Sequence, residues 1–352
     1  MQNGQMPHKP KQTPISDLGE FKLIEHLTHS FSPYKQPSTA KGVGDDAAVI
    51  HINEHHAIVV STDLLVEGIH FDLIYTPLKH LGYKAVVVNL SDIYAMNAIP
   101  RQITVSIAIS SRFTVEALEE LYSGIAAACK TYNVDLVGGD TSSTLKGMVI
   151  SITAIGDAHP NKITYRNTAQ IGDAICISGD LGAAYLGLQI LEREKRIYLD
   201  NPQVQPDLEE QSYLLGRQLK PEARADIIAH LNKLHIKPTA MIDVSDGLSS
   251  DLLHICTQSN VGCLITEEYI PVHTDTLDIS AKFHLSPITC MLNGGEDYEL
   301  LFTLNPQDAA TIEQDIYGVA VIGYIVPKDE GYKVISRGGN EHNLVAQGWK
   351  HI

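Results

Sequence analysis

Aspartates in short, turn-like segments are the feature of this 352-residue sequence that indicates chemistry. Two of them, Asp45 and Asp46, stand side by side after Gly42-Val43-Gly44. Four further segments of this kind follow along the chain: Ser61-Thr62-Asp63, Asn89-Leu90-Ser91-Asp92, Gly138-Gly139-Asp140-Thr141 and Asp243-Val244-Ser245-Asp246-Gly247. Each lies at the edge of an apolar run, where we expect a strand or helix to end, so the carboxylates can converge on one cleft. Like charges gathered in this way need cations between them.

The ligand types in these segments favour magnesium. Carboxylates are hard oxygen ligands, and no Cys or His accompanies them at metal-binding spacing. Mg²⁺ held by carboxylates keeps some water and takes phosphate oxygens as its remaining ligands. The sequence therefore predicts an enzyme that acts on a Mg-nucleotide.

A simple turn is the competing interpretation of each segment, because Asp and Gly are common turn residues. Asp45 and Asp46 fit it less well, since adjacent acids repel each other and gain little in a turn. Asp243 and Asp246 place two carboxylates three residues apart across a tight bend, which suits a pair of ions. His70 is one of 16 histidines, and a structural role is the simpler interpretation from the sequence alone.

Glycine pairs at Gly138-Gly139 and Gly294-Gly295 can bring backbone N–H groups close to a phosphate. The sequence contains no P-loop of the G-x-x-x-x-G-K-[ST] type and no kinase glycine-rich loop. A phosphoryl-transfer enzyme with this sequence must therefore have another architecture.

The composition predicts an acidic, globular protein. Hydrophobic residues make up 44% of the chain, and its length favours two domains. A net charge of −16 and a pI near 5.4 argue against a nucleic-acid partner, because binding a phosphate backbone requires a basic face. No apolar run reaches the roughly 18 residues that span a bilayer, and no signal-peptide stretch opens the chain, so we expect no membrane contact and a cytoplasmic location. We interpret the five cysteines as buried thiols and expect no disulfide.

Periodicity predicts the elements that must position these residues in the first half. Residues 1–16 are too polar to be buried and are predicted to form a disordered tail. Leu18, Phe21, Ile24 and Leu27 then recur at helical spacing behind Ser16, a candidate N-cap. The further elements are strands at 47–52, 57–61, 103–110, 134–137 and 148–155 and helices at 77–97 and 115–132.

A second unit is predicted to begin near Pro160. Its strands are expected at 173–178, 240–244 and from the Gly294-Gly295 turn to Phe302, and its helices at 183–193, 210–219, 223–234 and 248–259. Strands that alternate with helices indicate α/β or α+β layers. We therefore divide the chain into domains at 17–159 and 160–352.

Taken together, the motifs resemble those of the thiamine-monophosphate kinase family. The resemblance extends from about Leu18 to the C-terminus. It is carried by eight segments in one order: Gly-Glu-Phe (19–21), Val-Gly-Asp-Asp-Ala-Ala (43–48), Ser-Thr-Asp-x-Leu-Val-Glu-Gly-x-His-Phe (61–71), Gly-Tyr-Lys-Ala-x-x-x-Asn-Leu-Ser-Asp-x-x-Ala-Met (82–96), Val-Gly-Gly-Asp-Thr (137–141), Ile-Asp-Val-Ser-Asp-Gly-Leu (242–248), Gly-Gly-Glu-Asp-Tyr-Glu-Leu (294–300) and Gly-Trp-Lys (348–350). It implies a two-domain AIR-synthetase-like α/β fold, in which the N-terminal ATP- and Mg-binding domain dimerises through its sheet and ATP lies between the domains.

The resemblance also implies roles for individual residues, with Asp63 and Asp243 as the catalytic pair. The implied magnesium ligands are Asp46, Thr62, Asp63, Asp92, Asp140, Asp243 and Asp246, with Ser61 beside them and Asp45 as a candidate supporting acid. The implied ATP contacts are Tyr122, Gly139, Arg166 and Ser245. The implied contacts of thiamine monophosphate are His70, Glu296 and Trp349. An aromatic plane and a carboxylate suit a cationic thiazolium and an aminopyrimidine.

The implied reaction transfers the γ-phosphoryl group of ATP directly to thiamine monophosphate with the help of several Mg²⁺ ions, in a homodimer, and completes the synthesis of thiamine diphosphate. Two alternatives remain at this point. A related synthetase, for aminoimidazole ribonucleotide or selenophosphate, would use a similar ATP site on another acceptor. A nucleotide-binding or scaffold protein without turnover would bind ATP and form no ADP.

Overall fold

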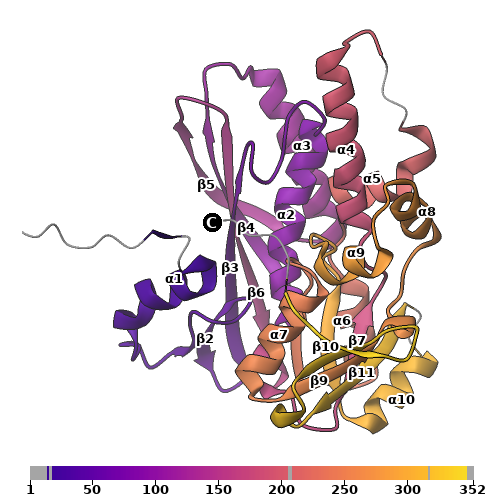
Figure 1. Cartoon of the computed structure of the whole chain (residues 1–352). Helices are drawn as coiled ribbons and strands as arrows, with labels where there is room; N and C mark the ends of the chain where they lie inside the picture. The colour runs from indigo at the N-terminus through magenta and orange to yellow at the C-terminus, as the bar shows by residue number, and fades with distance from the viewer. Residues whose placement is uncertain (1–13, 16–17, 205–207, 316–317, 347–352) are drawn as a thin grey trace, which may run out of the picture.

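The computed structural model describes residues 14–15, 18–204, 208–315 and 318–346 of the chain (Figure 1). The strands are β1 Thr39–Lys41, β2 Ala48–Asn53, β3 His56–Val66, β4 Ile99–Ile109, β5 Asp135–Ser143, β6 Met148–Ala158, β7 Ala174–Ser178, β8 Ala240–Asp243, β9 Gly262–Thr266, β10 Leu300–Leu304, β11 Val319–Val326, β12 Tyr332–Ile335 and β13 Glu341–Asn343. The α-helices are α1 Gly19–Thr28, α2 Leu78–Ala95, α3 Val115–Tyr132, α4 Ala183–Asp200, α5 Ser212–Leu219, α6 Ala225–Lys233, α7 Leu248–Ser259, α8 Thr274–Lys282, α9 Pro287–Asn293 and α10 Pro306–Asp315.

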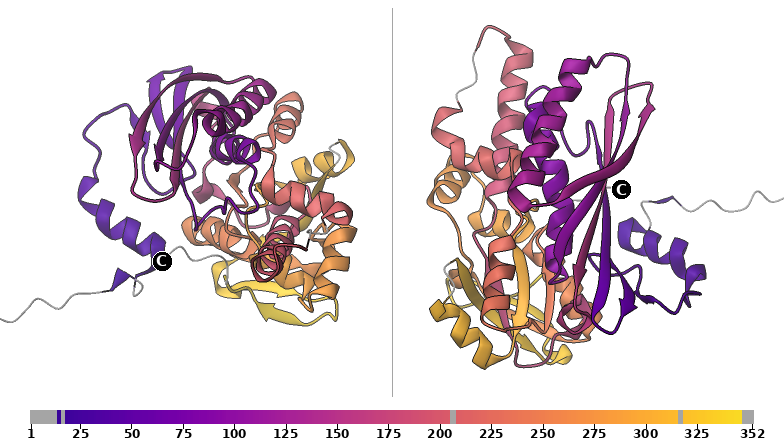
Figure 2. Two further views of the ribbon diagram at one scale, coloured as in Figure 1. Left: turned by 90° about the horizontal axis from the view of Figure 1, so that it is seen from above. Right: turned by 180° about the vertical axis from the view of Figure 1, so that it is seen from behind.

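The first sheet has six strands in the order β1-β2-β3-β6-β4-β5. Only the β4–β5 pair is parallel, and the long β3, β6 and β4 strands pair antiparallel over most of their length. Side chains of β6 alternate between buried and half-buried, as in a sheet with a single covered face. Helices α2 and α3 cover that face, on the side of the C-terminal half, and the other face turns away from that half (Figure 2).

The second sheet has seven strands in the order β13-β12-β9-β11-β7-β10-β8. Its central strands β7 and β10 and the edge strand β8 are buried at every residue, which fits their continuous apolar sequences. The two sheets therefore come from consecutive parts of the chain, as the predicted mixed α/β architecture requires. The domain boundary at residue 160 stays a prediction.

Helix α2 lies between the two sheets. Fourteen of its residues are buried, and it contacts β3, β4 and β6 of the first sheet as well as β8 and α5 of the second half. A helix that is apolar on all sides is stable only when it is buried on all sides. Its buried polar residues Lys84, Asn89 and Ser91 must therefore have partners within the protein.

Most predicted elements are confirmed, and the ends of α3 and α7 fall where the periodicity placed them. Two expectations were wrong. Asp63 does not end a strand but lies inside β3, because antiparallel pairing with β6 carries that strand on to Val66. The strand expected to be short and buried at 134–137 is β5, a longer strand exposed throughout, because it is an edge strand that pairs only with β4.

Three predictions lie outside the described residues. These are the N-cap at Ser16, the substrate contact of Trp349 and all but residues 14–15 of the predicted tail. Within the described ranges, no helix is both long and apolar enough to cross a membrane. The five cysteines all lie within the described residues, and none of them forms a disulfide bond.

Helices α2 and α3 cross in close contact through two glycines. A Cβ atom on Gly82 would lie 2.0 Å from the carbonyl oxygen of Leu121, and one on Gly124 would lie 1.9 Å from that of Lys79. Both clashes involve backbone, which cannot move aside as a flexible side chain can. The two glycines therefore set the distance between α2 and α3.

We predict that Gly124→Ala lowers the free energy of unfolding by about 1–3 kcal/mol, because the added methyl group forces the helices apart. Chemical denaturation followed by circular dichroism measures this change. Gly216→Ala in α5 is the matched control, since a Cβ atom there meets nothing within 4 Å. Equal unfolding free energies for the two variants would contradict the proposed close contact.

Candidate active site

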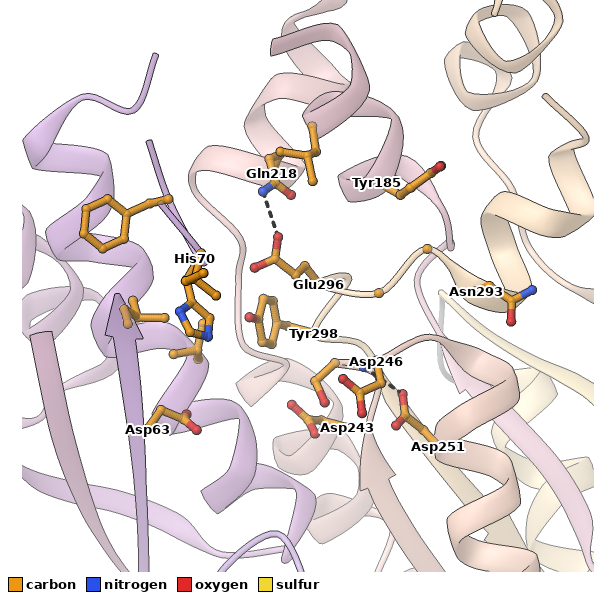
Figure 3. Close-up of a pocket in the computed structure, with 18 of the residues that line it drawn as sticks. Asp63, His70, Tyr185, Gln218, Asp243, Asp246, Asp251, Asn293, Glu296 and Tyr298 are labelled. Carbon is orange, nitrogen blue, oxygen red and sulfur yellow. Dashed lines mark hydrogen bonds between the residues drawn. The ribbon is translucent and has the colours of Figure 1, made fainter. Parts of the chain in front are cut away.

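A cleft of about 1110 Å³ lies between the two halves of the chain (Figure 3). The predicted site residues that line it are Asp46, Ser61, Thr62, Asp63, His70, Asp92, Arg166, Asp243, Ser245, Asp246 and Glu296. They come from β3, α2, the end of β8 and five segments that connect the main elements. Long-range packing thus gathers side chains that are up to 250 residues apart, from 46 to 296.

Three carboxylates form the centre of the cleft. Asp46, Asp92 and Asp243 each offer an oxygen atom, and these oxygens lie within 4.8 Å of one another. Asp46 comes from the loop before β2, Asp92 from the last turn of α2, and Asp243 is the last residue of β8. Three oxygen ligands at this spacing fit a hard divalent cation.

Burial disfavours charge on these groups. It raises the pKa of Asp63 to about 6. Burial, followed by the charge of Asp46, raises the pKa of Asp243 to about 7. The pKa of Asp92 is raised well above its usual value, first by burial and then by Asp63 and Asp243. A cluster that holds protons in this way is one that a cation can stabilise in the ionised form.

Neighbouring polar groups orient the carboxylates. Ser61 Oγ donates a hydrogen bond to Asp92, and Ser91 Oγ donates to Asp243 Oδ2 at 2.7 Å. The side-chain oxygen of Asn89 accepts a hydrogen bond from the backbone N–H of Asp63 at 2.9 Å. Asn89 and Ser91 belong to α2. This helix therefore binds Asp63 of the first sheet and Asp243 of the second.

Arg166 is the cation that contacts the cluster. Its Nη2 lies 2.5 Å from Asp46 Oδ1, and its Nε donates to Asp46 Oδ2 at 3.1 Å. Burial alone would lower the pKa of this guanidinium, but the charges of Asp46 and Asp45 raise it above its usual value. Asp45 accepts the backbone N–H of Arg166 at 3.2 Å and pairs with Lys41 at 3.0 Å. Asp45 thus anchors Arg166 and does not line the cleft.

Several residues that line the cleft were not assigned to the site from the sequence, among them Asp251, Phe21 and His254. Asp251 is buried in the first turn of α7, and its carboxylate accepts the backbone N–H groups of Asp246 and Gly247 at 3.3 and 3.1 Å. It therefore holds the bend that carries Asp246 (Figure 3). Phe21 of α1 and His254 of α7 face each other with ring centroids 4.2 Å apart. Asp251 follows Asp246 by five residues, a signal that could have been used, whereas the Phe21–His254 contact has no local signal.

Glu296 forms the other end of the cleft, on the loop between α9 and β10. Lys84 Nζ lies 3.0 Å from Glu296 Oε1. Gln218 Nε2 donates to Glu296 Oε2 at 2.7 Å (Figure 3). Glu296 and Tyr298 have φ values of +57° and +52°, which are uncommon outside glycine and mark a loop held by its surroundings. His70, on the loop after β3, accepts the backbone N–H of Val66 through Nδ1 at 3.0 Å.

Besides Asp45, three predicted residues within the described ranges do not line this cleft. Gly139 and Asp140 lie on the exposed strand β5, and Tyr122 lies half-buried on α3. The register pairs Asp63 with β6 and Gly139 with β4, so Gly139 is three strands away, roughly 14 Å across the sheet. One chain alone does not bring these residues to the carboxylates.

The fold and the site agree with comparisons to known proteins. Residues 44–158, which contain β2–β6 with α2 and α3, match the family described as AIR synthase related protein, N-terminal domain. That match defines the structural class: an AIR-synthase-related α/β protein with a carboxylate-lined cleft.

Similarity to known proteins over the full length of the chain identifies a particular family within this class. The chain is 33% identical to the thiamine-monophosphate kinase of Bacillus subtilis (strain 168), over 95% of this chain and 100% of that protein. It is 32% identical to the thiamine-monophosphate kinase of Aquifex aeolicus (strain VF5), over 96% and 99%. A solved structure described as AaThiL complexed with AMPPCP and TMP is 28% identical and superposes with a TM-score of 0.81, covering 97% of this chain and 99% of that one. The chain belongs to the thiamine-monophosphate kinase family.

The raised pKa values predict how Mg²⁺ and pH act together on stability. The ordinary pKa of an Asp is near 3.8, whereas burial raises the pKa of Asp63 to about 6 and that of Asp243 to about 7 in the fold. Their stabilising protons are present below about pH 4 and are lost as the pH rises through 6 to 7. Because Mg²⁺ replaces those protons, we expect it to raise the melting temperature little at about pH 5 and much more at about pH 8.

Thermal melting in EDTA and in MgCl₂ across this pH range measures the effect. Asp243→Asn should flatten the pH dependence of the Mg²⁺ shift, because one titrating ligand is removed. A shift of equal size at both pH values would contradict a carboxylate site for the metal.

Proposed function

We propose that this protein phosphorylates thiamine monophosphate with ATP and releases thiamine diphosphate and ADP. The observation that carries the proposal is the cleft itself, in which Asp46, Asp92 and Asp243 lie beside Arg166 and open toward Glu296. Membership of the thiamine-monophosphate kinase family supports it. So does the similar AaThiL structure, which holds AMPPCP, a non-hydrolysable ATP analogue, together with TMP.

In the proposed reaction, a phosphate oxygen of thiamine monophosphate attacks the γ-phosphorus of ATP. The new P–O bond forms as the bond from the γ-phosphorus to the β–γ bridging oxygen breaks, and its electron pair leaves with ADP. The attacking oxygen already carries negative charge, so no general base is needed. The protein must instead align two anions and offset their repulsion.

The carboxylates fit Mg²⁺ in number, type and spacing. We assign the metal to Asp46, Asp63, Asp92, Asp243 and Asp246, with Ser61 and Thr62 at its edge. Bound Mg²⁺ would supply charge neutralisation for the phosphates. Arg166 and Ser245 lie beside these carboxylates and are assigned to the phosphates of ATP, while His70 and Glu296 are assigned to thiamine monophosphate.

We predict that Asp63→Asn and Asp243→Asn each lower kcat by at least about 100-fold, because each removes a charge that the transition state requires. A coupled assay for ADP and chromatographic separation of thiamine phosphates measure turnover. The fold should persist, and the melting temperature in EDTA should rise, because each substitution removes one of several repelling buried charges.

Asp329→Asn, at an exposed position remote from the cleft, is the matched control and should keep the kcat of the unmodified protein. Turnover that is unchanged in both cleft variants would overturn the metal assignment. ATP binding without thiamine diphosphate would instead point to another acceptor or to a protein without turnover.

We further propose a homodimer formed through the open face of the first sheet. Eleven outward side chains of its long strands are small or apolar and uncharged: Ile58, Val60, Thr62, Leu64, Thr104, Ser106, Ala108, Val149, Ser151, Thr153 and Ile155. Arg101 and Asp157, which lie at one end of these strands, form an ion pair with each other. Thr62 and Leu64 lie on this face and also line the cleft. Asp140 pairs with Ser106 on the same face, so a second copy packed here places the predicted ligand at the interface.

We predict that Ser106→Arg converts this dimer to a monomer, because it introduces a charge at the centre of the packed face. Size-exclusion chromatography with light scattering measures the mass. Ser123→Arg, on the exposed side of α3, is the control and should leave the dimer intact. A monomeric unmodified protein would contradict the proposal.

A further inference from the structure

We propose that Lys84 and Gln218 are positioning residues for the acceptor substrate, which act by holding the carboxylate of Glu296 in place. This inference rests on the proposed function, because it concerns the end of the cleft assigned to thiamine monophosphate. It assigns a role to two buried side chains that do not belong to the carboxylate cluster.

The contacts form a closed arrangement around Glu296. Lys84 Nζ lies 3.0 Å from Glu296 Oε1 and donates to the backbone carbonyl of Gln218 at 3.1 Å. Gln218 Nε2 donates to Glu296 Oε2 at 2.7 Å. Each carboxylate oxygen therefore has its own donor, and the two donors are linked to each other. Charge-assisted hydrogen bonds of this kind fix direction as well as distance.

Burial makes the arrangement significant. Lys84 is 4% exposed and Gln218 is 5% exposed, whereas the side chain of Glu296 keeps 30% of its surface in the cleft. A lysine is almost never fully buried unless it is paired, and here its ionic partner is the most exposed member of the group, although Gln218 also lines the cleft. Lys84 and Gln218, which are buried, thus hold the more exposed carboxylate of Glu296 in place.

The loop that carries Glu296 is clamped a second time. Asp297 accepts the backbone N–H of Gly182 at 2.8 Å, and Arg217 Nη1 lies 2.8 Å from Glu299 Oε1. Arg217 and Gln218 are neighbours on α5, so one turn of that helix holds both Glu299 and Glu296. This explains how the φ of +57° at Glu296 is maintained.

The position of Lys84 on α2 also fixes its distance from Ser91, on the same helix. Ser91, which donates to the metal-cluster residue Asp243, follows Lys84 by seven residues, nearly two full turns on the same face. At 1.5 Å per residue the two positions are about 10.5 Å apart along the axis. One rigid, buried helix face therefore holds both the acceptor end of the cleft, through Glu296, and the phosphoryl-transfer end, through Asp243.

A carboxylate held by two donors on its protein side still offers lone pairs to the donors of an aminopyrimidine and a negative charge to a thiazolium cation. Removing Lys84 frees Glu296 to turn, so it should weaken binding of the acceptor and spare binding of ATP. We expect Lys84→Met and Gln218→Met each to raise the KM for thiamine monophosphate about tenfold or more and to leave the KM for ATP within about twofold.

The experiment measures both KM values by ADP release for the full-length protein with Mg²⁺. Lys79→Met, an exposed lysine on the same helix, is the matched control and should change neither value. A double mutant, Lys84→Met with Glu296→Gln, tests the route: its KM for thiamine monophosphate should equal that of Glu296→Gln alone, because Lys84 acts through Glu296.

The unmodified protein separates the two proposals. If it forms no thiamine diphosphate, the proposed function fails, whatever the variants do. If it does, equal rises in both KM values, or multiplicative effects in the double mutant, would overturn the positioning role and leave a general packing role for Lys84. Should Lys84→Met fail to fold, Gln218→Met decides the question, since it buries no unpaired charge of its own.

Discussion

Repulsion between buried carboxylates is the constraint on which the rest of this structure depends. Asp46, Asp92 and Asp243 present oxygens within 4.8 Å of one another, and burial holds the pKa of Asp92 and Asp243 above that of an ordinary aspartate. Such a cluster destabilises the folded protein at neutral pH when no cation is bound, and it favours the binding of cations. Arg166 offsets part of this negative charge, and Mg²⁺ that binds together with a nucleotide would offset the rest. Stability and substrate binding are therefore linked through the same charges.

Helix α2 makes this arrangement possible. Its apolar surface is buried between two sheets, so its buried polar residues must find their partners within the protein. Asn89, Ser91 and Lys84 each contact a residue that reaches the cleft, and these partners come from both halves of the chain. The close crossing of α2 with α3 through glycine fixes the helix against the first sheet. The packing of α2 thus determines where several residues of the cleft lie.

The cleft that results suits a reaction between two anions. One end gathers negative side chains that require cations, and the other presents a carboxylate held by a lysine and a glutamine. A nucleotide phosphate fits the first end through metal, and a cationic heterocycle fits the second by charge. The chain is similar to thiamine-monophosphate kinases over almost its full length. The geometry also explains why no catalytic triad is needed, since the nucleophile is already charged.

The sequence by itself determined many of the elements between α1 and α7, and it indicated the kind of chemistry to expect at the site. Local periodicity placed α3 and α7, and turn-like aspartate segments indicated magnesium and phosphate, because these signals depend on residues close along the chain. Only the tertiary structure decided which carboxylates meet, since strand pairing and helix packing join residues far apart. It extended β3 past Asp63, left Asp140 on an exposed edge strand, and brought Lys84 to Glu296 across more than 200 residues. Contacts such as the one between Lys84 and Glu296 form because the two halves of the chain bury their surfaces against each other. A local sequence pattern does not encode packing of this kind.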